Sequence, residues 1–390
     1  MRDFIFEIKK VLIYQKGAWF ILLLILLKIL SLAILDNSAN LSLEADKEDY
    51  LFYLEQVKGA LTEENESFFR DESEKIASAK VKLENLYSDY YDGVLYNQVM
   101  PEAELDSLSK PFEEQIEKEK GFQLIYDQYM YVRENPDNRY FLYTNGWNAL
   151  LAHERLDLSM FFLLLLLIAP MFCNEYESKM DIILLSSKKG RVTLVLKKIL
   201  LAFGMVTLLS LLFSLIEYTY FHFQYGLSDG HYPIQSLEYF HSSLKNMSLF
   251  EAFIRSSVYK LFGYLCFSVL IMFVSVCTKK TILTLFISTV VILLPYFGLT
   301  ARWIQYLLPL PLGFMLGSGF FRGDEIAGSA DAIEPKVVFR AITDTEFTII
   351  AVLLILIALT MILLMTKKFI NFQSIRKEIQ SIRREAGEKQ

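Results

Sequence analysis

Residues 17–35, GAWFILLLILLKILSLAIL, decide the fold of this chain. Their only charged member is Lys28, and about 20 apolar residues in a helix can cross the roughly 30 Å hydrocarbon core of a membrane. No small-residue cleavage site lies between this run and the polar sequence that follows it. We therefore expect a retained first membrane-spanning helix, not a signal peptide.

An acidic block follows this helix. Residues 36–157 contain 27 Asp and Glu residues and 12 Lys and Arg residues, a net charge of −15. Since the whole chain has a net charge of −6, the remainder has a net charge of +9. Such a split excludes a single globular core, a nucleic-acid binder with one basic face and a disordered chain. The block contains no cysteine, so we expect a water-exposed domain that folds on an apolar core without disulfides.

Apolar runs long enough to span a membrane occur at six places in the chain. The second is short and contains Pro170 near its end. The six runs are Gly17–Leu35, Leu158–Cys173, Ile199–Ile216, Leu261–Cys277, Ile282–Leu299 and Phe347–Met365. They predict an all-α membrane protein with six transmembrane helices, five of them in residues 158–365.

Basic residues beside the spans set the expected orientation. They gather before the first span, between the second and third, between the fourth and fifth, and in the tail at 366–390. Cytoplasmic loops carry the excess of Lys and Arg, so both termini are expected in the cytoplasm. The acidic block at 36–157 is then expected on the outer side.

The segments between the spans also carry structural signals. Residues 1–16 have apolar residues at helical spacing opposite lysines, which predicts an amphipathic helix in the inner interface, with a simple basic flank as the alternative. The block at 36–157 is expected to be helical, with one helix over 112–132. Residues 301–321 are apolar and rich in Pro and Gly, which favours a re-entrant or interfacial hairpin on the outer side.

Two charged residues fall inside the predicted spans, where an ionisable side chain is a functional hypothesis by default. Lys28 lies about two thirds along the first span, and Glu217 follows the third. Their estimated depths differ by roughly 10 Å at 1.5 Å per residue. We therefore expect each side chain to extend separately toward the interface, with pairing across the bundle as the alternative.

Signatures of catalysis and of metal binding are absent from the sequence. There is no GxxxxGK[ST] phosphate loop, no HExxH motif and no nucleophile elbow, and the spacing of His222, His231 and His241 matches no zinc pattern. We expect no catalytic residue, no metal and no cofactor in this chain. A protein that moves or holds something is favoured over an enzyme.

The most specific segment is residues 173–200, CNEYESKMDIILLSSKKGRVTLVLKKIL. Acidic residues leave the second span, a short amphipathic helix near 178–187 follows, and a basic turn leads into the third span. The segment resembles the coupling loop of type-2 ATP-binding-cassette (ABC) exporter permeases, in which a Glu, a short helix, an LLSSP-type turn, a basic residue and a Lys follow in this order. The residues that match or line this loop at 173–198 are Glu175, Glu177, Met180, Ile183, Leu184, Leu185 and Arg191. Lys188 stands where that family often has Pro.

This resemblance implies a division of labour. A separate cytoplasmic ABC ATPase subunit would bind ATP and Mg and hydrolyse the nucleotide, and the short helix would sit in a groove on it. Two permease chains, identical or related, would form the working unit in a bacterial plasma membrane, in contact with lipid and with no nucleic acid. The interfacial helix, the six spans and the large outer domain agree with the same family.

Three functions are compatible with the sequence. The first is export of an amphipathic cargo, such as a peptide antibiotic, a drug or a lipid-like molecule, because the spans contain no charged pathway. Sodium efflux is the second, since related permeases with a similar outer domain perform it. A membrane scaffold or signalling protein with an extracellular binding domain is the third, although a scaffold needs no coupling helix.

Overall fold

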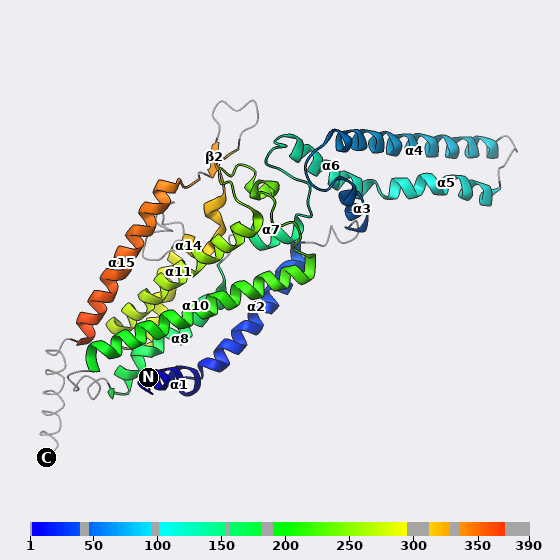
Figure 1. The fold of residues 1–390 in the computed structure, drawn as a ribbon. Helices are drawn as coiled ribbons and strands as arrows, with labels where there is room; N and C mark the ends of the chain where they lie inside the picture. Colours follow the sequence, from blue (N-terminus) through cyan, green and yellow to red (C-terminus); the bar gives the residue numbers. More distant parts are fainter. Residues whose placement is uncertain are drawn as a thin grey trace, which may run out of the picture. The chain divides into compact units, whose positions relative to one another are not determined.

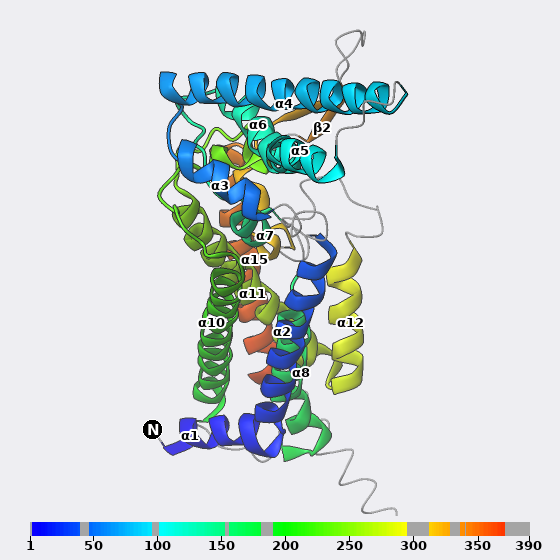
Figure 2. The same cartoon turned by 90° about the vertical axis from the view of Figure 1, so that its right-hand side faces the viewer.

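The computed structural model describes residues 2–39, 47–95, 101–152, 156–180, 190–294, 312–327, 336–339 and 341–370. Five of its helices are long and apolar enough to cross a membrane, which indicates a multi-pass membrane protein. They are α2 (Gly17–Ala39), α8 (Leu158–Glu177), α10 (Gly190–Tyr225), α11 (Leu249–Thr278) and α15 (Asp344–Ile370). Figures 1 and 2 show them running along one another.

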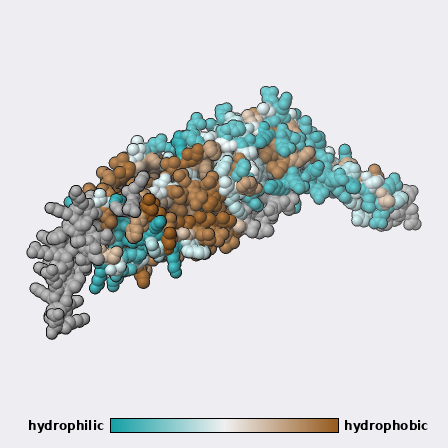
Figure 3. All heavy atoms as spheres, turned by 60° about the horizontal axis from the view of Figure 1, so that its bottom comes forward, coloured by the Kyte–Doolittle hydropathy of each residue, from teal (hydrophilic) through white to brown (hydrophobic). Residues whose placement is uncertain are grey.

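The chain divides into two compact units. The first contains residues 1–33, 153–221 and 251–390, and the second contains residues 34–152 and 222–250. Figure 3 shows apolar surface gathered over the long helices of the first unit and hydrophilic surface over the second. The composition split seen in the sequence therefore corresponds to two separately packed bodies.

Most of these helices extend beyond the apolar runs from which they were predicted. The third run, Ile199–Ile216, lies inside α10, which is 36 residues long, and α8 continues through Pro170 to Glu177. An apolar window stops at the first charges, whereas the helix continues through the polar flank that bears them. The fifth run begins with α12 (Thr281–Leu293), an apolar helix shorter than the five long ones, and its last five residues lie outside the described residues.

Shorter elements complete the first unit. Helix α1 (Arg2–Lys9) leads into a π-helix, η1 (Lys10–Tyr14), and the expected outer hairpin is described only from residue 312 onward. There α14 (Leu312–Leu316) is buried against α11, where a Cβ on Gly263 would lie 2.8 Å from the Met315 nitrogen. A 3₁₀-helix, η5 (Ser318–Phe321), follows α14.

One small sheet departs from the all-helical expectation. Strands β1 (Glu325–Ala327) and β2 (Lys336–Phe339) pair in antiparallel fashion before α15 begins. These strands are three and four residues long, and so short a run shows too little period-2 alternation to be found in the sequence. The rest of the regular structure described is helical.

The second unit is a helical domain with an aromatic core. Its helices are α3 (Lys47–Val57), α4 (Glu63–Leu95), α5 (Glu102–Glu117), α6 (Glu119–Arg133) and α7 (Asn145–Leu151), and two 3₁₀ turns, η2 (Ile234–Ser236) and η3 (Glu238–Phe240), follow later in the chain. Helix α4 packs along α5, and α3 packs on α6. The single helix expected over 112–132 is in fact two, α5 and α6, which meet at Lys118.

The aromatic core of this unit is centred on Phe69. Its ring stacks on Tyr129 at 4.3 Å between centroids and on Phe141 at 5.8 Å. Buried aromatic rings of this kind contribute large apolar areas and additional geometric preference. The unit therefore has the disulfide-free apolar core that the sequence predicted.

Candidate functional site

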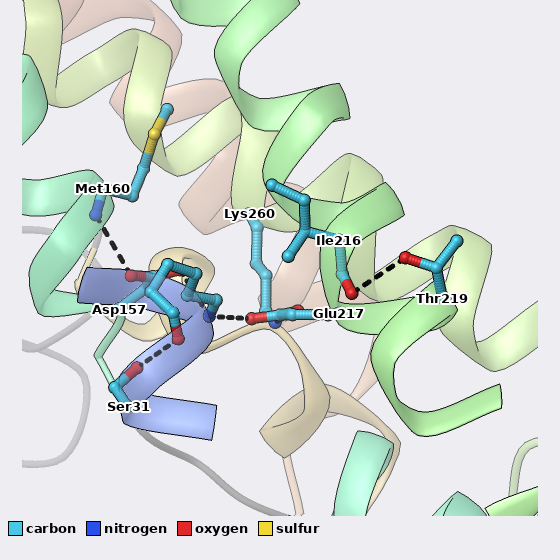
Figure 4. A network of polar contacts seen from close by, with 8 residues as sticks. Ser31, Asp157, Met160, Ile216, Glu217, Thr219 and Lys260 are labelled. Carbon is cyan, nitrogen blue, oxygen red and sulfur yellow. Dashed lines mark hydrogen bonds and ion pairs between the residues drawn. The ribbon is translucent and has the colours of Figure 1, made fainter. Parts of the chain in front are cut away.

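Four charged side chains meet inside the helical bundle of the first unit and form what we call the Lys28 cluster. Lys28 Nζ lies 2.7 Å from Asp157 Oδ2 and 2.5 Å from Glu217 Oε1, and Lys260 Nζ lies 3.2 Å from Glu217 Oε2. Figure 4 shows Asp157, Glu217 and Lys260 directed toward one another. The side chains are 6% to 20% exposed, and two cations meet two carboxylates, so the cluster is neutral.

Each member of the Lys28 cluster comes from a different long helix. Lys28 lies on α2, Glu217 on α10 and Lys260 on α11. Asp157 is the N-cap of α8, where its Oδ1 accepts the backbone N–H of Met160 at 3.0 Å. The cluster therefore joins four helices that are far apart in sequence.

The structure overturns the expectation that Lys28 and Glu217 are independent. Their charged atoms are in contact, so the pairing alternative is correct. Depth was estimated from the ends of apolar runs, but α10 continues for two turns beyond Glu217, to Tyr225. The Lys28 side chain is also long enough to cover part of the difference in depth between the two backbone positions.

A second group of charges, which we call the Glu175 cluster, lies near the other end of α8. Glu175 Oε1 lies 2.6 Å from Lys198 Nζ and 3.0 Å from Lys10 Nζ. Both the Glu175 and Lys198 side chains are buried, and Lys198 also donates to the carbonyl of Met171. The Lys198 ammonium lies 4.8 Å from the centroid of the Phe172 ring. This cluster fixes the N-terminal segment, α8 and the start of α10 to one another.

The separation of the two clusters is close to a membrane thickness. Asp157 and Glu175 are 18 residues apart along α8, about 27 Å at 1.5 Å per residue. Lys198 and Glu217 are 19 residues apart along α10, about 29 Å. The hydrocarbon core of a bilayer is about 30 Å thick, so the spacing fits one cluster at each border of that layer. Charged groups cost least there, because headgroups and water are close.

The residues expected to couple to a partner are found in different settings. Glu175 is buried in its cluster, whereas Glu177 and Met180 are exposed at the end of α8. Arg191 lies in the first turn of α10, and Ile183, Leu184 and Leu185 lie outside the described residues. A groove of about 460 Å³ is lined by Lys10, Asn174, Glu175, Glu177, Ser178 and Met180.

Glu177 also has a structural role that sequence reasoning missed. Its Oε1 accepts the backbone N–H of Thr281 at 2.7 Å, in the first turn of α12. The first N–H groups of a helix have no partner within it, so a carboxylate there satisfies one of them and favours the helix dipole. Glu177 thereby links α8 to the start of α12.

We expect Glu177→Ala to lower the free energy of unfolding by about 1 kcal/mol, the usual cost of losing such a cap. Glu177→Gln should cost less, because its amide oxygen still accepts the hydrogen bond. Chemical unfolding of the purified protein in mixed micelles measures both values, and Glu74→Ala on the exposed face of α4 is the control. Equal losses for the Ala and Gln variants would show that the charge matters and not the cap.

Asp157 and Lys260 were also missed, although each left a signal. Asp157 stands directly before an apolar run, which is the usual place of a helix N-cap. Lys260 immediately precedes the predicted fourth span, so its position at the border was visible but its partner was not. Long-range partners of single charges follow from helix packing, which one sequence does not encode locally.

No family model, curated protein or solved structure matches this chain. Within the part of the chain that the structure describes, no group of three or more His, Cys, Asp or Glu residues is arranged to hold a metal ion. The two clusters and the sequence that follows α8 are therefore the features that bear on function.

Proposed function

We propose that this chain is the membrane-spanning permease subunit of an ABC exporter, driven by a separate ATPase subunit. The observation that carries the proposal is the segment 173–200, whose order of Glu, short apolar helix, double-Leu double-Ser turn and basic residues resembles the coupling loop of that family. It joins the end of α8 to the start of α10 in the bundle. No phosphate-binding loop occurs in the sequence, so a partner would have to supply ATP hydrolysis.

Charge distribution supports an orientation for this permease. Lys10 and Lys198 lie in the Glu175 cluster, and Lys179 follows α8 at the same end. Lys279, which precedes α12, lies 5.0 Å from the ring of Tyr176 near the end of α8. Inner loops are rich in lysine and arginine, so we assign the Glu175 cluster to the cytoplasmic border and the Lys28 cluster to the outer border.

The sixth span belongs to the same proposal. Helix α12 contacts α8 in the bundle and is an apolar helix of 13 residues. Continued to Leu299, as the sequence predicts, it would complete an even number of spans with both termini in the cytoplasm. The acidic second unit would then be extracytoplasmic.

The interior between the clusters favours an amphipathic cargo over a bare ion. The described core there is built from aliphatic and aromatic side chains, including the stacked rings of Phe161 and Phe267 at 5.2 Å. Both carboxylates of the Lys28 cluster already bind ammonium groups. Sodium efflux would need oxygen ligands that are not already paired with ammonium groups. Sodium therefore stays the alternative cargo.

We expect Met180→Ser and Leu184→Ser to abolish most transport-coupled ATPase activity while the chain still inserts. Both changes remove apolar contact from the segment that would enter the ATPase groove, and Met180 is 49% exposed in this chain alone. Activity is measured as vanadate-sensitive ATP hydrolysis, and its stimulation by candidate cargoes, in the co-purified complex in nanodiscs. Leu108→Ser, at an exposed apolar position on α5 that is 44% exposed, is the matched control.

Two results would contradict this proposal. The first is full coupling in both loop variants, which would remove the docking role. The second is a stable chain that brings down no nucleotide-binding subunit, which would favour the membrane-scaffold function.

A further inference from the structure

A pocket in the second unit is not used by the proposed export function. It has a volume of about 310 Å³ and lies between α3 and the segment that follows α10. The residues that line it are Lys47, Leu51, Leu54, Glu55, Lys58, Tyr143, Tyr225, Gly226, Ser228 and Asp229. Small-molecule sites begin at about 300 Å³, so only a short ligand fits.

The walls of the pocket are held by direct contacts within the unit. The Trp147 indole N–H donates to the carbonyl of Ser228 at 2.7 Å. A Cβ on Gly146 would lie 2.9 Å from the Cβ of Tyr225, so α7 approaches the Tyr225 wall as closely as a glycine allows. The Lys58 ammonium binds Asp229 at 2.7 Å and joins α3 to the opposite segment. The cavity is therefore preformed.

One face of α3, together with Lys58 just after its end, supplies half of the lining and arranges its charges in order. Lys47, Leu51, Leu54 and Glu55 follow the i, i+4, i+7, i+8 spacing of a single helix face, and Lys58 is the first residue after the helix. The two leucines form an apolar middle, which Tyr143 and Tyr225 border from the other side. The charged residues on this side of the pocket, Lys47, Glu55 and Lys58, lie on either side of the two leucines.

The two ends of the pocket have opposite charge. At one end, the Lys47 ammonium lies 5.8 Å from the Tyr143 ring centroid and 6.0 Å from that of Tyr225, and it forms no ion pair with a carboxylate among the described residues. At the other end, Asp229 neutralises Lys58, and the exposed Glu55 leaves a net negative charge. Burial raises the pKa of Asp229, but the bonds from Lys58 and Ser228 outweigh it and hold that pKa below its usual range.

We propose that this pocket binds a short zwitterionic peptide, with its carboxylate at Lys47, its ammonium group at Glu55 beside the Lys58–Asp229 pair, and apolar side chains over Leu51 and Leu54. Lys47 and Glu55 are eight residues apart, about 12 Å along α3. Three extended peptide residues span about 10 Å, so a tripeptide matches both the charge separation and the small volume. This binding site does not depend on the export function.

The test uses trileucine and two capped forms of it, one acetylated at the amine and one amidated at the carboxylate. Binding is measured by isothermal titration calorimetry on the full chain in nanodiscs, with empty nanodiscs subtracted. We expect trileucine to bind, and each cap to weaken binding about tenfold or more, because a hydrogen-bonded charge contact is worth roughly 1.5–3 kcal/mol.

Two variants assign the ends of the peptide. Lys47→Gln should weaken trileucine binding about tenfold and leave the amidated peptide unaffected, because the carboxylate that Lys47 would bind is already gone. Glu55→Gln should weaken trileucine in the same way and leave the acetylated peptide unaffected. Lys82→Gln is the matched control, since Lys82 also lies over an aromatic ring, Phe112 at 5.8 Å, but outside the pocket.

Three binding results would contradict the proposed peptide site. Absence of trileucine binding at about 1 mM, or equal binding of the free and capped peptides, would overturn the proposal. Equal weakening of all three peptides by Lys47→Gln would show a loss of pocket structure instead of a lost charge contact, and would also overturn the assignment of the ends. None of these results bears on ATPase coupling, so the export function would stand or fall separately.

Discussion

Replacing Glu175 by leucine is expected to destabilise the bundle by about 3–5 kcal/mol. Glu175 Oε1 is the shared acceptor of Lys10 and Lys198. Without it, the fully buried Lys198 ammonium loses this carboxylate and keeps the carbonyl of Met171 and the ring of Phe172. A buried charge that loses its counter-charge costs far more than the pair itself contributes.

A double variant separates this cause from a simple loss of packing. Glu175→Leu with Lys198→Met removes both buried charges, so we expect it to be more stable than Glu175→Leu alone. The free energy of unfolding is measured by chemical unfolding in mixed micelles. Glu251→Leu is the control, because its pair with Arg255 is 43% and 47% exposed and such surface pairs contribute at most about 1 kcal/mol. A double variant less stable than Glu175→Leu would contradict the explanation.

Replacing Lys28 by methionine is expected to cost about 3–5 kcal/mol as well, for the opposite reason. This change leaves the carboxylates of Asp157 and Glu217 in the bundle with Lys260 as the only remaining cation of the Lys28 cluster. The excess negative charge lies among helices that Lys28 holds together. Thermal unfolding of the purified chain and its yield after insertion both report the loss.

Partial rescue tests the charge balance of the Lys28 cluster. Lys28→Met with Asp157→Asn restores neutrality and keeps a side-chain oxygen to cap α8, so we expect part of the lost stability to return. Lys80→Met is the control, since its exposed pair with Glu119 joins helices of the second unit. No recovery in the double variant would show that Lys28 stabilises by packing and not by charge.

The long helices were predictable because their signal is local. Apolar runs such as Phe347–Met365 contain no charged residue over a length that crosses a bilayer, which is the pattern of a membrane-spanning helix. Their ends were not predictable, since α10 continues on both sides of its apolar run through residues that water or headgroups can solvate. The two strands before α15 are too short for an alternation of apolar and polar residues to reveal them in the sequence.

The charged clusters could be predicted only in part. Lys28 and Glu217 were visible as single charges in apolar surroundings, but their contact depends on how α2 and α10 pack. Glu175 was interpreted as a residue that faces a partner, and its burial between Lys10 and Lys198 follows from the position of the N-terminal segment. Sequence spacing places charges along one helix, whereas tertiary packing decides which charges meet.

Helix α8 is joined to its neighbours by ion pairs at both of its ends, and this restricts how it can move. Sliding along its own axis would break the Asp157 contact and the Glu175 contacts together. Tilting as a rigid rod about either end would preserve one set of ion pairs while the other exchanges partners. A displacement applied to the loop after Glu177 would therefore reach the opposite end of the bundle along one continuous helix, in which Pro170 is the position that lacks a backbone N–H.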